Sequence, residues 1–500
     1  MGLRVWDTVA ADFLSVEASM IIKNLDELVS HGDRKGRELA LSVLEGGLQA
    51  SDPYANTQKL LRIEGNRLLV GGQSDMDVSG FGDEAIDLET VEHIYVIGAG
   101  KAVQCQAKAL EDLLGDRLTA GAITIKHGEP HLLDRITVTE GAHPVPDEGS
   151  VRGAERIAEL ARRATARDLV ITVFSDGASS LSPLPASGIT LDDLHALYRL
   201  AIKYGSQQVI IRSMGYFSQL SRGRLMQILQ PARSINLIMQ VGLFERWGGR
   251  IPNSSSFVPT WPSGRQRLAQ DRAWFMAQPW FGELPPLMQK VLDGADPEYD
   301  VPGLEAFSSM QMSFWQPIDL YQMVEGARQR AEALGLKGVV LSSHLTALSG
   351  EAANVLAQIA HECEAYGRPF EPPVALITGG HLDVPVGDAT GVGGRNQEFA
   401  LSWGCLLSSG RLASRRVVVA AVDSDGTDGP GTQLSGGEPI CMAGGVTDGY
   451  LGEEADAAGI DLAAELANHN ATVPLMRLKN AIYTGNTGTC LGDLRVAVVI

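Results

Sequence analysis

The chain has 500 residues, of which 44% are hydrophobic and 20% are charged, which is the balance of a globular protein too long for one ordinary core. Its formal net charge of −19 argues against nucleic acid or an anionic membrane as a partner. Because it has no apolar run of the roughly 18 residues that a membrane span needs, and no signal-peptide layout at its N-terminus, we expect a soluble protein of the cytoplasm.

Strand–loop–helix units recur through the first half of the chain. Residues 15–48 have apolar positions at helical spacing. The apolar run Ile94–Ile97 predicts a short strand, followed by a glycine turn and a helix from Ala102. Residues 168–175 predict a second strand that ends in a polar loop. This alternation is typical of a parallel sheet covered by helices, so we assign 1–250 to an N-terminal Rossmann-like α/β domain.

The composition changes between residues 251 and 315, which are rich in Pro, Trp, Ser and Gly. We expect this stretch to be an irregular junction between two domains. A second alternation of helices and strands follows, and we assign 316–500 to a C-terminal α/β domain. Its predicted elements are helix 318–334, strand 338–343, helix 349–365, strand 374–380 and strand 416–423.

Lys101 directly follows Gly98-Ala99-Gly100 at a predicted strand-to-helix turn. Glycines let backbone N–H groups approach a ligand closely, and a helix N-terminus favours an anion. A lysine there adds a mobile positive charge suited to phosphate or carboxylate. The alternative is a surface lysine at an ordinary turn. The stretch is neither a P-loop nor a complete G-x-G-x-x-G fingerprint, because Val103 stands at the third glycine.

Two further loops of the first half carry candidate side chains. His143 lies in 141-GAHPVPDEGS-150, where prolines fix the backbone, so it can move a proton or bond a loop carbonyl. Small polar residues after the strand 168–175 suit a phosphate or polyol pocket, with an ordinary turn as the alternative. The side chains that this loop offers are those of Ser175, Asp176, Ser179 and Ser180.

The segment 423-DSDGTDG-429 brings the carboxylates of Asp423, Asp425 and Asp428 close together. Carboxylates this close repel one another unless a cation or hydrogen-bond donors compensate. A hard cation such as Mg²⁺ prefers oxygen ligands, so we predict a metal site here. The alternative is an Asp-rich turn.

The stretch 391-GVGGRNQEFA-400 places Arg395 behind a glycine run and before a predicted helix from Asn396. We expect the helix start and a bound anion to hold this arginine. The segment 484-TGNTGTCLGDL-494 has the same style, and its threonines could contact anionic oxygens. Six Gly-rich loops, most of them just after predicted strands, indicate a cleft that handles an anion or a nucleotide.

In chain order, these segments resemble the class II glycerate 2-kinase family, whose C-terminal part is the MOFRL domain. The resemblance runs from about residue 90 to the end of the chain. It implies an N-terminal parallel sheet and a C-terminal MOFRL-type mixed sheet, with the active site in the cleft between them. The matching pieces are GAGKA (98–102), HPVPDEG (143–149), LSPLPASGITLDDL after Ser175, GEA (350–352), GGRNQE (393–398), DSDGTDG (423–429) and TGNTGT (484–489).

The resemblance implies ATP and Mg²⁺, or another divalent metal, and phosphoryl transfer to the 2-hydroxyl of glycerate or a related sugar acid. By position, Lys101 and Arg395 match the proposed catalytic lysine and arginine of the family, and we add His143 as a catalytic candidate. Fixed cations and a metal would stabilise charge on a transferring phosphoryl group. The predicted substrate and nucleotide residues are Gly98, Gly100, Ser175, Asp176, Ser179, Ser180, His344, Gly380, His381, Gly394, Asn396, Glu398, Thr487 and Thr489, and the predicted metal ligands are Asp423, Asp425 and Asp428.

The chain departs from the family pattern in several loops. Asp176 brings a negative charge to a loop that is SGGGSAL in the family. A basic stretch of the family is replaced by 211-IRSMGYFSQLSRG-223, where Met214, Gly215 and Tyr216 stand in place of Arg, Lys and His. Two later motifs are replaced by 240-QVGLFE-245 and 253-NSSSFVP-259, and GGE-T becomes 379-GGHL-382.

These departures leave more than one function open. The first is a kinase acting on a small anionic carboxylate, with neither nucleic acid nor membrane as a partner and with room for a homodimer. The alternative is a non-kinase descendant, a metal-assisted lyase, isomerase or hydrolase acting on a carboxylated polyol or keto acid. In that alternative, His381 acts with His143, His344 and an aspartate of 423–428 to hold a divalent metal or to supply acid–base catalysis. A third is an inactive binding subunit. We rank the kinase first because one clear family scaffold covers most of the chain.

Overall fold

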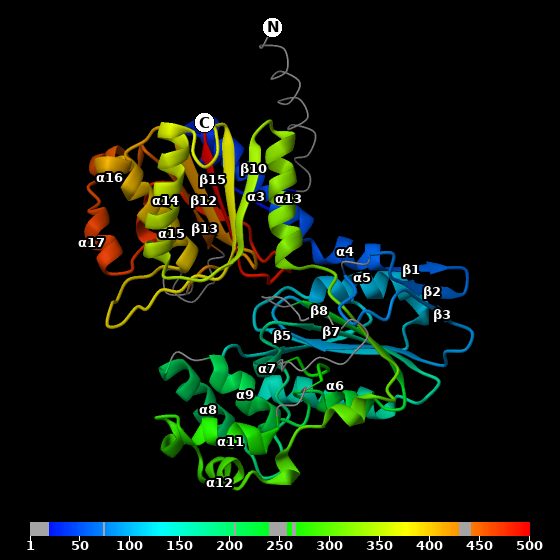
Figure 1. Ribbon diagram of the computed structural model, residues 1–500. Helices are drawn as coiled ribbons and strands as arrows, with labels where there is room; N and C mark the ends of the chain where they lie inside the picture. The colour runs from blue at the N-terminus through cyan, green and yellow to red at the C-terminus, as the bar shows by residue number, and fades with distance from the viewer. Residues whose placement is uncertain (1–19, 74–75, 205–206, 240–257, 263–266, 430–441) are drawn as a thin grey trace. The chain divides into compact units, whose positions relative to one another are not determined.

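The computed structural model describes residues 20–73, 76–204, 207–239, 258–262, 267–429 and 442–500. The chain forms two compact units (Figure 1). The described residues up to Asp52 together with Asp319–Ile500 make unit 1, and Pro53–Ile318 make unit 2. Within the described ranges, no helix combines the length and the apolar character that crossing a membrane requires.

Unit 2 is built on a fully parallel six-stranded sheet, as predicted. Alternate residues of its central strand face different cores: Tyr95 and Ile97 pack with helix α6 (Glu148–Arg163), and Ile94 and Val96 pack with helix α5 (Gln104–Leu114). Both faces are therefore covered, which is why the central strands are apolar throughout. In sheet order the strands are β6 (Thr137–Gly141), β5 (Ala120–Lys126), β4 (Ile94–Ala99), β7 (Leu169–Ser175), β8 (Arg233–Met239) and β9 (Met312–Trp315).

The predicted irregular junction is wrong where the structure describes it, because 258–262 and 267–315 lie inside unit 2. Their aromatic residues fill a core, since Trp280 and Phe275 are buried with Met288 and Tyr216. Residues 240–257 lie outside the described residues.

In the described part of unit 2, the remaining elements are three strands and seven α-helices. Strands β1 (Leu61–Glu64), β2 (Arg67–Val70) and β3 (Glu84–Asp87) form a small antiparallel sheet. The helices are α4 (Pro53–Leu60), α7 (Ala178–Leu181), α8 (Leu191–Lys203), α9 (Gln207–Phe217), α10 (Arg224–Leu229), α11 (Leu268–Met276) and α12 (Pro286–Gly294).

Unit 1 contains a mixed six-stranded sheet, as predicted, with one parallel pairing between β10 and β11. Helices α3 (Arg34–Ala50) and α13 (Leu320–Ala333) pack on one face, and α14 (Ser349–Tyr366) and α15 (Arg395–Ser408) on the other (Figure 1). In sheet order the strands are β10 (Lys337–Leu345), β11 (Val374–Gly380), β15 (Asp493–Val499), β12 (Val417–Asp423), β13 (Met442–Asp448) and β14 (Ala481–Tyr483). Short helices α2 (Leu25–Leu28), α16 (Leu451–Ala458), α17 (Leu462–Ala467) and α18 (Thr472–Arg477) complete the unit.

The assignment of the chain start to the N-terminal domain is wrong, because α3 belongs to unit 1. Buried Arg37 donates from Nε to Asp448 Oδ2 at 2.6 Å and from Nη1 to Asn480 Oδ1 at 2.8 Å. A buried ion pair of this kind fixes the helix to the C-terminal sheet, since breaking it leaves an uncompensated charge. The partners lie 411 positions apart, so local sequence patterns could not reveal the contact.

Glycines let α3 and α13 approach closely. A Cβ atom on Gly326 would lie 2.2 Å from Ala50 Cβ and 2.9 Å from the Gly46 carbonyl oxygen. A Cβ on Gly47 would lie 2.8 Å from the Met323 carbonyl oxygen. No side chain fits at these distances, so the docking of α3 depends on the three glycines.

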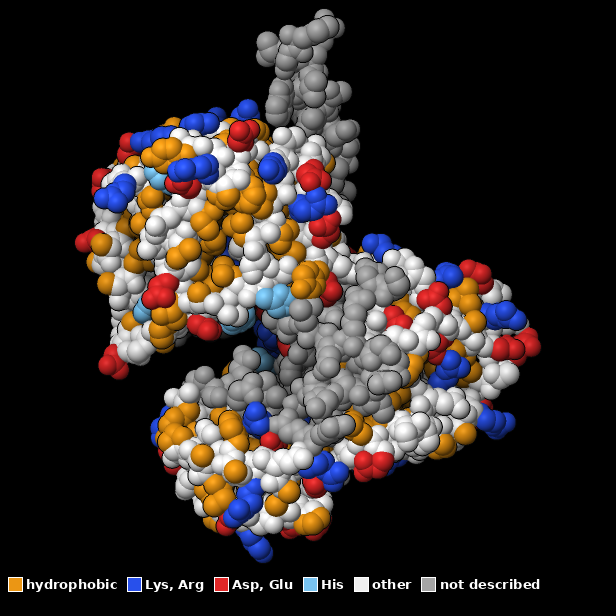
Figure 2. All heavy atoms as spheres, in the orientation of Figure 1, with side chains coloured by type: hydrophobic (Ala, Val, Ile, Leu, Met, Phe, Trp, Pro, Cys, Tyr) orange, Lys and Arg blue, Asp and Glu red, His pale blue; other side chains and the backbone are white. Residues whose placement is uncertain are grey.

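The surface of unit 1 over α14 and β10 carries hydrophobic side chains between charged ones (Figure 2). On α14, Val355 is 57% exposed and Tyr366 is 64% exposed. Single exposed apolar residues are usual on soluble proteins, so we assign no site to this surface.

Replacing Gly326 by valine is expected to lower the free energy of unfolding by about 1–3 kcal/mol, because the added side chain overpacks the α3–α13 contact. Urea-induced unfolding at equilibrium measures the change. Gly350→Ala in α14 is the matched control, since its Cβ would meet nothing nearer than Ser402 Oγ at 3.8 Å. The control should be neutral or stabilising, and equal losses in both variants would contradict the packing argument.

Candidate functional site

The first group of predicted site residues meets at the carboxyl edge of the parallel sheet in unit 2. Lys101 and Gly177 follow the neighbouring strands β4 and β7, and His143 follows β6, which β5 separates from β4. A Cβ on Gly177 would lie 2.9 Å from Lys101 Cγ and 3.1 Å from His143 Cδ2. The structure therefore brings together three loops that the sequence had marked separately.

The backbone of Lys101 is held by the loop after β7. Its N–H donates to the Asp176 carbonyl oxygen at 2.9 Å, and the N–H of Ala102 donates to Ser175 Oγ at 3.0 Å. Gly100 has φ +148°, and a Cβ there would lie 2.0 Å from Ser175 Oγ. Gly100, Ser175 and the Asp176 backbone thus position Lys101. Gly98 has a similar packing role, since its Cβ would lie 1.9 Å from the Val173 carbonyl oxygen.

Two of the predicted serines, Ser179 and Ser180, lie on α7, which has only four residues. Ser180 is buried, and its hydroxyl donates to the Gly177 carbonyl oxygen at 3.0 Å. Burial raises the pKa of the Tyr198 phenol, and a hydrogen bond with Ser179 opposes that rise. Ser179 is half-buried and therefore the more accessible of the two hydroxyl groups.

The arginines near the replaced basic stretch are occupied by an internal carboxylate. Arg212 Nη1 donates to Asp271 Oδ1 at 2.9 Å, and Arg222 Nη1 lies 3.7 Å from Asp271 Oδ2. Tyr216 donates its hydroxyl to the same buried carboxylate. Because both cations are neutralised locally, they do not restore the positive charge that the resemblance leads one to expect in this region.

The second group of predicted residues lies in unit 1, where β11 and β12 end and β15 begins. The antiparallel register places Asp493 of β15 beside Gly380 of β11 and beside Asp423 of β12. Helix α15 begins at Arg395, and Asn396 Nδ2 donates to Asp493 Oδ1 at 2.7 Å.

Arg395 is held by two carboxylates of the chain itself. Its Nε donates to Asp493 Oδ1 at 2.8 Å, and its Nη2 donates to Asp423 Oδ2 at 2.6 Å. Burial lowers the pKa of Arg395, but Asp423 and Asp493 outweigh burial and keep the pKa above its ordinary value. Within the described residues, Nη1 makes no hydrogen bond to the protein, and the side chain is 18% exposed. One edge of the guanidinium therefore remains for an anion.

The helix N-terminus behind Arg395 does not face a ligand, contrary to our expectation. Buried Asp428 accepts the backbone N–H of Asn396 at 3.0 Å and of Gln397 at 2.9 Å. A Cβ on Gly394 would lie 2.2 Å from Asp428 Oδ2, so glycine is required beside this cap. Burial raises the pKa of Asp428 to about 6, although Arg395 opposes the rise. The chain supplies its own anion for the helix start.

The predicted metal site on the three aspartates does not form in the structure. Among the described residues, these carboxylates are not a group of three ligand atoms within 4.8 Å of one another. Asp423 binds Arg395, and Asp428 caps α15. Asp425 is partly exposed, and its Oδ1 accepts the Thr427 N–H at 2.8 Å. Clustered carboxylates can be compensated by a cation or by hydrogen-bond donors. We predicted a cation, but in the structure hydrogen-bond donors compensate them.

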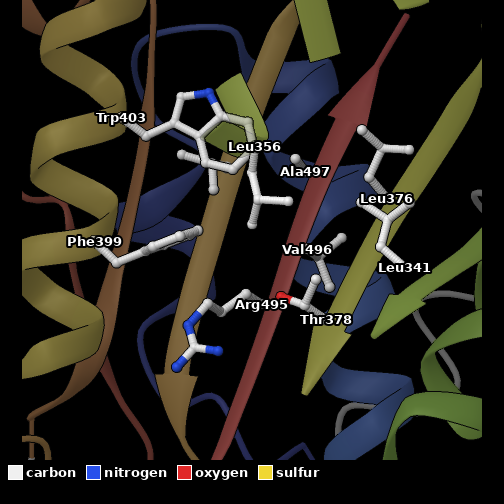
Figure 3. Close-up of a pocket in the computed structure, with 10 residues that line it drawn as sticks. Leu341, Leu356, Leu376, Thr378, Phe399, Trp403, Arg495, Val496 and Ala497 are labelled. Atoms are coloured by element: carbon white, nitrogen blue, oxygen red, sulfur yellow. The ribbon is translucent and has the colours of Figure 1, made fainter. Parts of the chain in front are cut away.

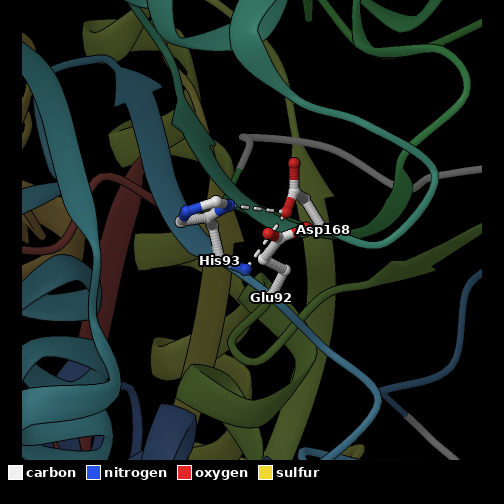
Figure 4. A group of neighbouring side chains, drawn as sticks. All are labelled: Glu92, His93 and Asp168. Atoms are coloured by element: carbon white, nitrogen blue, oxygen red, sulfur yellow. Dashed lines mark hydrogen bonds and ion pairs between the residues drawn. The ribbon is translucent and has the colours of Figure 1, made fainter.

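A different group in the described chain does have three potential metal ligands within this distance of one another: Glu92, His93 and Asp168 (Figure 4). It lies where β4 and β7 begin, at the edge of the sheet opposite Lys101. Asp168 Oδ1 lies 3.0 Å from His93 Nδ1, Oδ2 accepts the Thr165 N–H at 2.7 Å, and Glu92 is paired with Arg167. These partners fasten two strand starts, so we assign no metal there.

The histidines of the non-kinase alternative do not form a metal site within unit 1. The backbone N–H of His381 donates to the Leu345 carbonyl oxygen at 3.0 Å. Burial lowers the pKa of its imidazole ring, and the charge of Arg395 lowers it further. His344 is exposed, with its ring 5.5 Å from that of Tyr321. In the described part of unit 1, neither belongs to a group of three metal ligands.

The last predicted residues bond to their own chain. Glu398 Oε2 lies 2.7 Å from His469 Nδ1, and Thr489 Oγ1 donates to the Ser51 carbonyl oxygen at 3.2 Å. Thr487 donates its hydroxyl to the Ser424 carbonyl oxygen. The residue that our sequence analysis missed is Asp493. Its signal was present: two charged residues, Asp493 and Arg495, interrupt the apolar strand 493-DLRVAVV-499.

Two family models match the chain. One, described as a domain of unknown function (DUF4147), matches residues 39–240, and the other, the MOFRL family, matches 374–493. A glycerate 2-kinase from Pyrococcus horikoshii is 28% identical over 478 residues, covering 93% of this chain and 97% of the relative. A putative hydroxypyruvate reductase from Agrobacterium vitis is 29% identical over 413 residues, covering 81% and 98%. The crystal structure of a glycerate kinase from Thermotoga maritima has the same fold, with a TM-score of 0.73 at 24% identity, covering 93% and 99%.

Replacing Asp428 by alanine is expected to lower the free energy of unfolding by about 2–4 kcal/mol, because it leaves buried N–H groups of Asn396 and Gln397 without a partner. Asp461→Ala removes the exposed cap of α17, which accepts from Ala463 and Ala464, and should cost about 1 kcal/mol. Urea unfolding compares the two variants. If Asp428→Ala proves no more costly than the control, the capping role is refuted.

Proposed function

We propose that this chain transfers the terminal phosphoryl group of ATP to the 2-hydroxyl of glycerate or a related sugar acid, because it belongs to the class II glycerate 2-kinase family. The observation that carries the proposal is a pair of cationic residues, Lys101 and Arg395, each held at the edge of its own sheet where neighbouring strands end. A cytoplasmic location is part of this proposal, because the reaction needs ATP.

Lys101 and Arg395 suit different tasks in phosphoryl transfer. In this reaction, positive charge stabilises the oxygens of the transferring group, and positioning supplies most of the remaining catalysis. The backbone of Lys101 is fixed, and its ammonium group is a compact charge on a four-carbon stem, which suits a phosphoryl group in transfer. Arg395 is a rigid donor whose Nη1 edge suits anionic oxygens of the substrates.

His143 lies beside Lys101 and Gly177 and is our candidate for the base. In the proposed step, the 2-hydroxyl oxygen bonds to the γ-phosphorus of ATP, and the bond from that phosphorus to the bridging oxygen breaks. The hydroxyl proton passes to His143, and ADP leaves with the bonding electrons. An imidazole is suited to this proton because its ordinary pKa lies near neutrality.

Magnesium bound with ATP would neutralise negative charge on the phosphates. Asp423 and Asp428 do not fit as its ligands, because they already neutralise Arg395 and cap α15. We propose that Mg²⁺ is used with the nucleotide, but we assign it no set of carboxylates in this chain and route no step through it.

A reductase, as the name of the A. vitis relative suggests, has less support from the residues present. The loop after β4 lacks the third glycine of a dinucleotide fingerprint, because Val103 stands there. Purified enzyme with ATP, Mg²⁺ and a panel of 2-hydroxy acids that includes glycerate should release ADP, and ³¹P NMR should show a 2-phosphorylated product. No ADP with any acid would reject the kinase, and NADH oxidation with hydroxypyruvate would favour the reductase.

Lys101→Met is expected to lower kcat of this reaction by roughly 100-fold or more, the usual effect of removing one contact to developing charge. Lys108→Met is the matched control on α5, where Lys108 pairs with Asp112 at 2.7 Å on the surface. The control should keep kcat within about twofold, since surface pairs contribute little. Equal effects of the two substitutions would exclude Lys101 from catalysis.

Gly177→Ala should lower kcat by roughly tenfold or more, because its Cβ displaces Lys101 and His143, and small misplacements are costly in catalysis. Gly128→Ala controls for backbone strain: φ is +80° at Gly128 and +86° at Gly177, but a Cβ on Gly128 meets nothing within 4 Å. Steady-state kinetics on both variants separates the two effects. If the two variants lost kcat to the same extent, backbone strain alone would explain the loss, and the contact with Lys101 and His143 would not.

A further inference from the structure

Arg495 is a buried cation two residues beyond Asp493 on the same face of β15. Its register partners are Thr378 on β11 and Ala421 on β12, and it is 1% exposed. Its side chain reaches from β15 toward Phe399 on α15 (Figure 3), with the guanidinium carbon 5.4 Å from the centroid of that ring. A charged residue in the middle of a buried strand requires a specific explanation.

Packing alone does not explain this arginine. Its Nη2 donates to Asp493 Oδ2, but Nε and Nη1 have no partner among the described protein atoms. A cavity of about 10 Å³ lies beside it, lined mainly by apolar side chains such as Leu356 and Trp403 (Figure 3). A buried cation with unpaired donors is costly, and an aliphatic side chain would stabilise the same position better.

The bonds of Asp493 show what Arg495 does. Asp493 Oδ1 accepts from Arg395 Nε at 2.8 Å and from Asn396 Nδ2 at 2.7 Å, and Arg395 Nη2 also lies 2.8 Å from this oxygen. Asp493 Oδ2 accepts from Arg495 and from the Leu382 N–H at 3.1 Å. The two oxygens are therefore divided between two guanidinium groups, and the rotation of the carboxylate is fixed from both sides.

We propose that Arg495 is a positioning residue for Arg395 and acts through Asp493. By occupying Oδ2, it leaves Arg395 with Oδ1 alone, so that Arg395 can also reach Asp423 and keep one edge toward an anion. Without Arg495, the carboxylate can turn and take Arg395 as a bidentate pair, which is the preferred geometry of these two groups. Arg395 then moves away from Asp423. The catalytic consequence rests on the proposed kinase function.

The test compares Arg495→Met with Arg37→Met. Arg37 forms a second buried Arg–Asp pair in unit 1, with Asp448, and has no contact with Arg395 among the described residues. Arg495→Met should lower kcat by about 10–100-fold, as removal of an outer-shell partner does, with KM for ATP within about threefold. Arg37→Met should lower the melting temperature more than Arg495→Met does and leave kcat of the folded enzyme unchanged. Arg495→Lys, which keeps a cation on Oδ2, should restore most of kcat.

A crystal structure of Arg495→Met supplies a readout that does not depend on activity. In the wild type, Nε and Nη2 of Arg395 both lie 2.8 Å from the same oxygen, Asp493 Oδ1. In the variant we expect each of these nitrogens on its own oxygen of Asp493, and the loss of the bond to Asp423. An unmoved Arg395, or a wild-type kcat, overturns the proposal. If the wild-type enzyme is not a kinase, the crystal structure still decides the link between the two arginines. Arg495→Gln, judged by the same criteria, replaces the methionine variant if that variant does not fold.

Discussion

One buried carboxylate, that of Asp493, joins the elements of the unit 1 site. It binds Arg395 and Asn396 of α15, Arg495 of its own strand and the backbone of Leu382. A charged group with 0% exposure is stable only with such donors. Burial raises the pKa of Asp493, but Arg495 and Arg395 outweigh burial and keep the pKa below its ordinary value. Because β15 begins where β11 and β12 end, this one group fixes a helix to three strands.

Unit 2 holds its cation by a different principle. The backbone around Lys101 is fixed by the Asp176 carbonyl oxygen, by the Ser175 hydroxyl and by the absence of side chains at Gly100 and Gly177. In unit 2 the described contacts act on the backbone, whereas in unit 1 the carboxylates of Asp493 and Asp423 bind the guanidinium of Arg395 itself. One cationic residue is thus positioned through its backbone and the other through its side chain.

The strands and helices that we predicted correctly are encoded by local sequence patterns. The contacts that we could not predict join residues that lie far apart in the sequence. Strand 374–380 matches β11 residue for residue, since a uniform apolar run between turns is a local signal. The partner of Arg395 lies 98 positions away, and that of Arg37 lies 411 positions away, so neither pair appears in any local pattern. The acidic segment after β12 misled us because clustered carboxylates have two solutions. A metal and a set of N–H donors both compensate them, and only the fold brings Asn396 and Gln397 to Asp428.

The pairing of Arg395 with two aspartates explains how an acidic protein can present a cation to an anionic substrate. If a substrate anion displaced Asp493 or Asp423, it would leave a buried carboxylate uncompensated, which costs about 3–5 kcal/mol. In the proposed function, the anion therefore adds to the existing bonds and binds the Nη1 edge. Only arginine can do this, because its five donors lie in one plane around a rigid fork. A lysine in the same place would have to leave its carboxylates in order to reach the substrate.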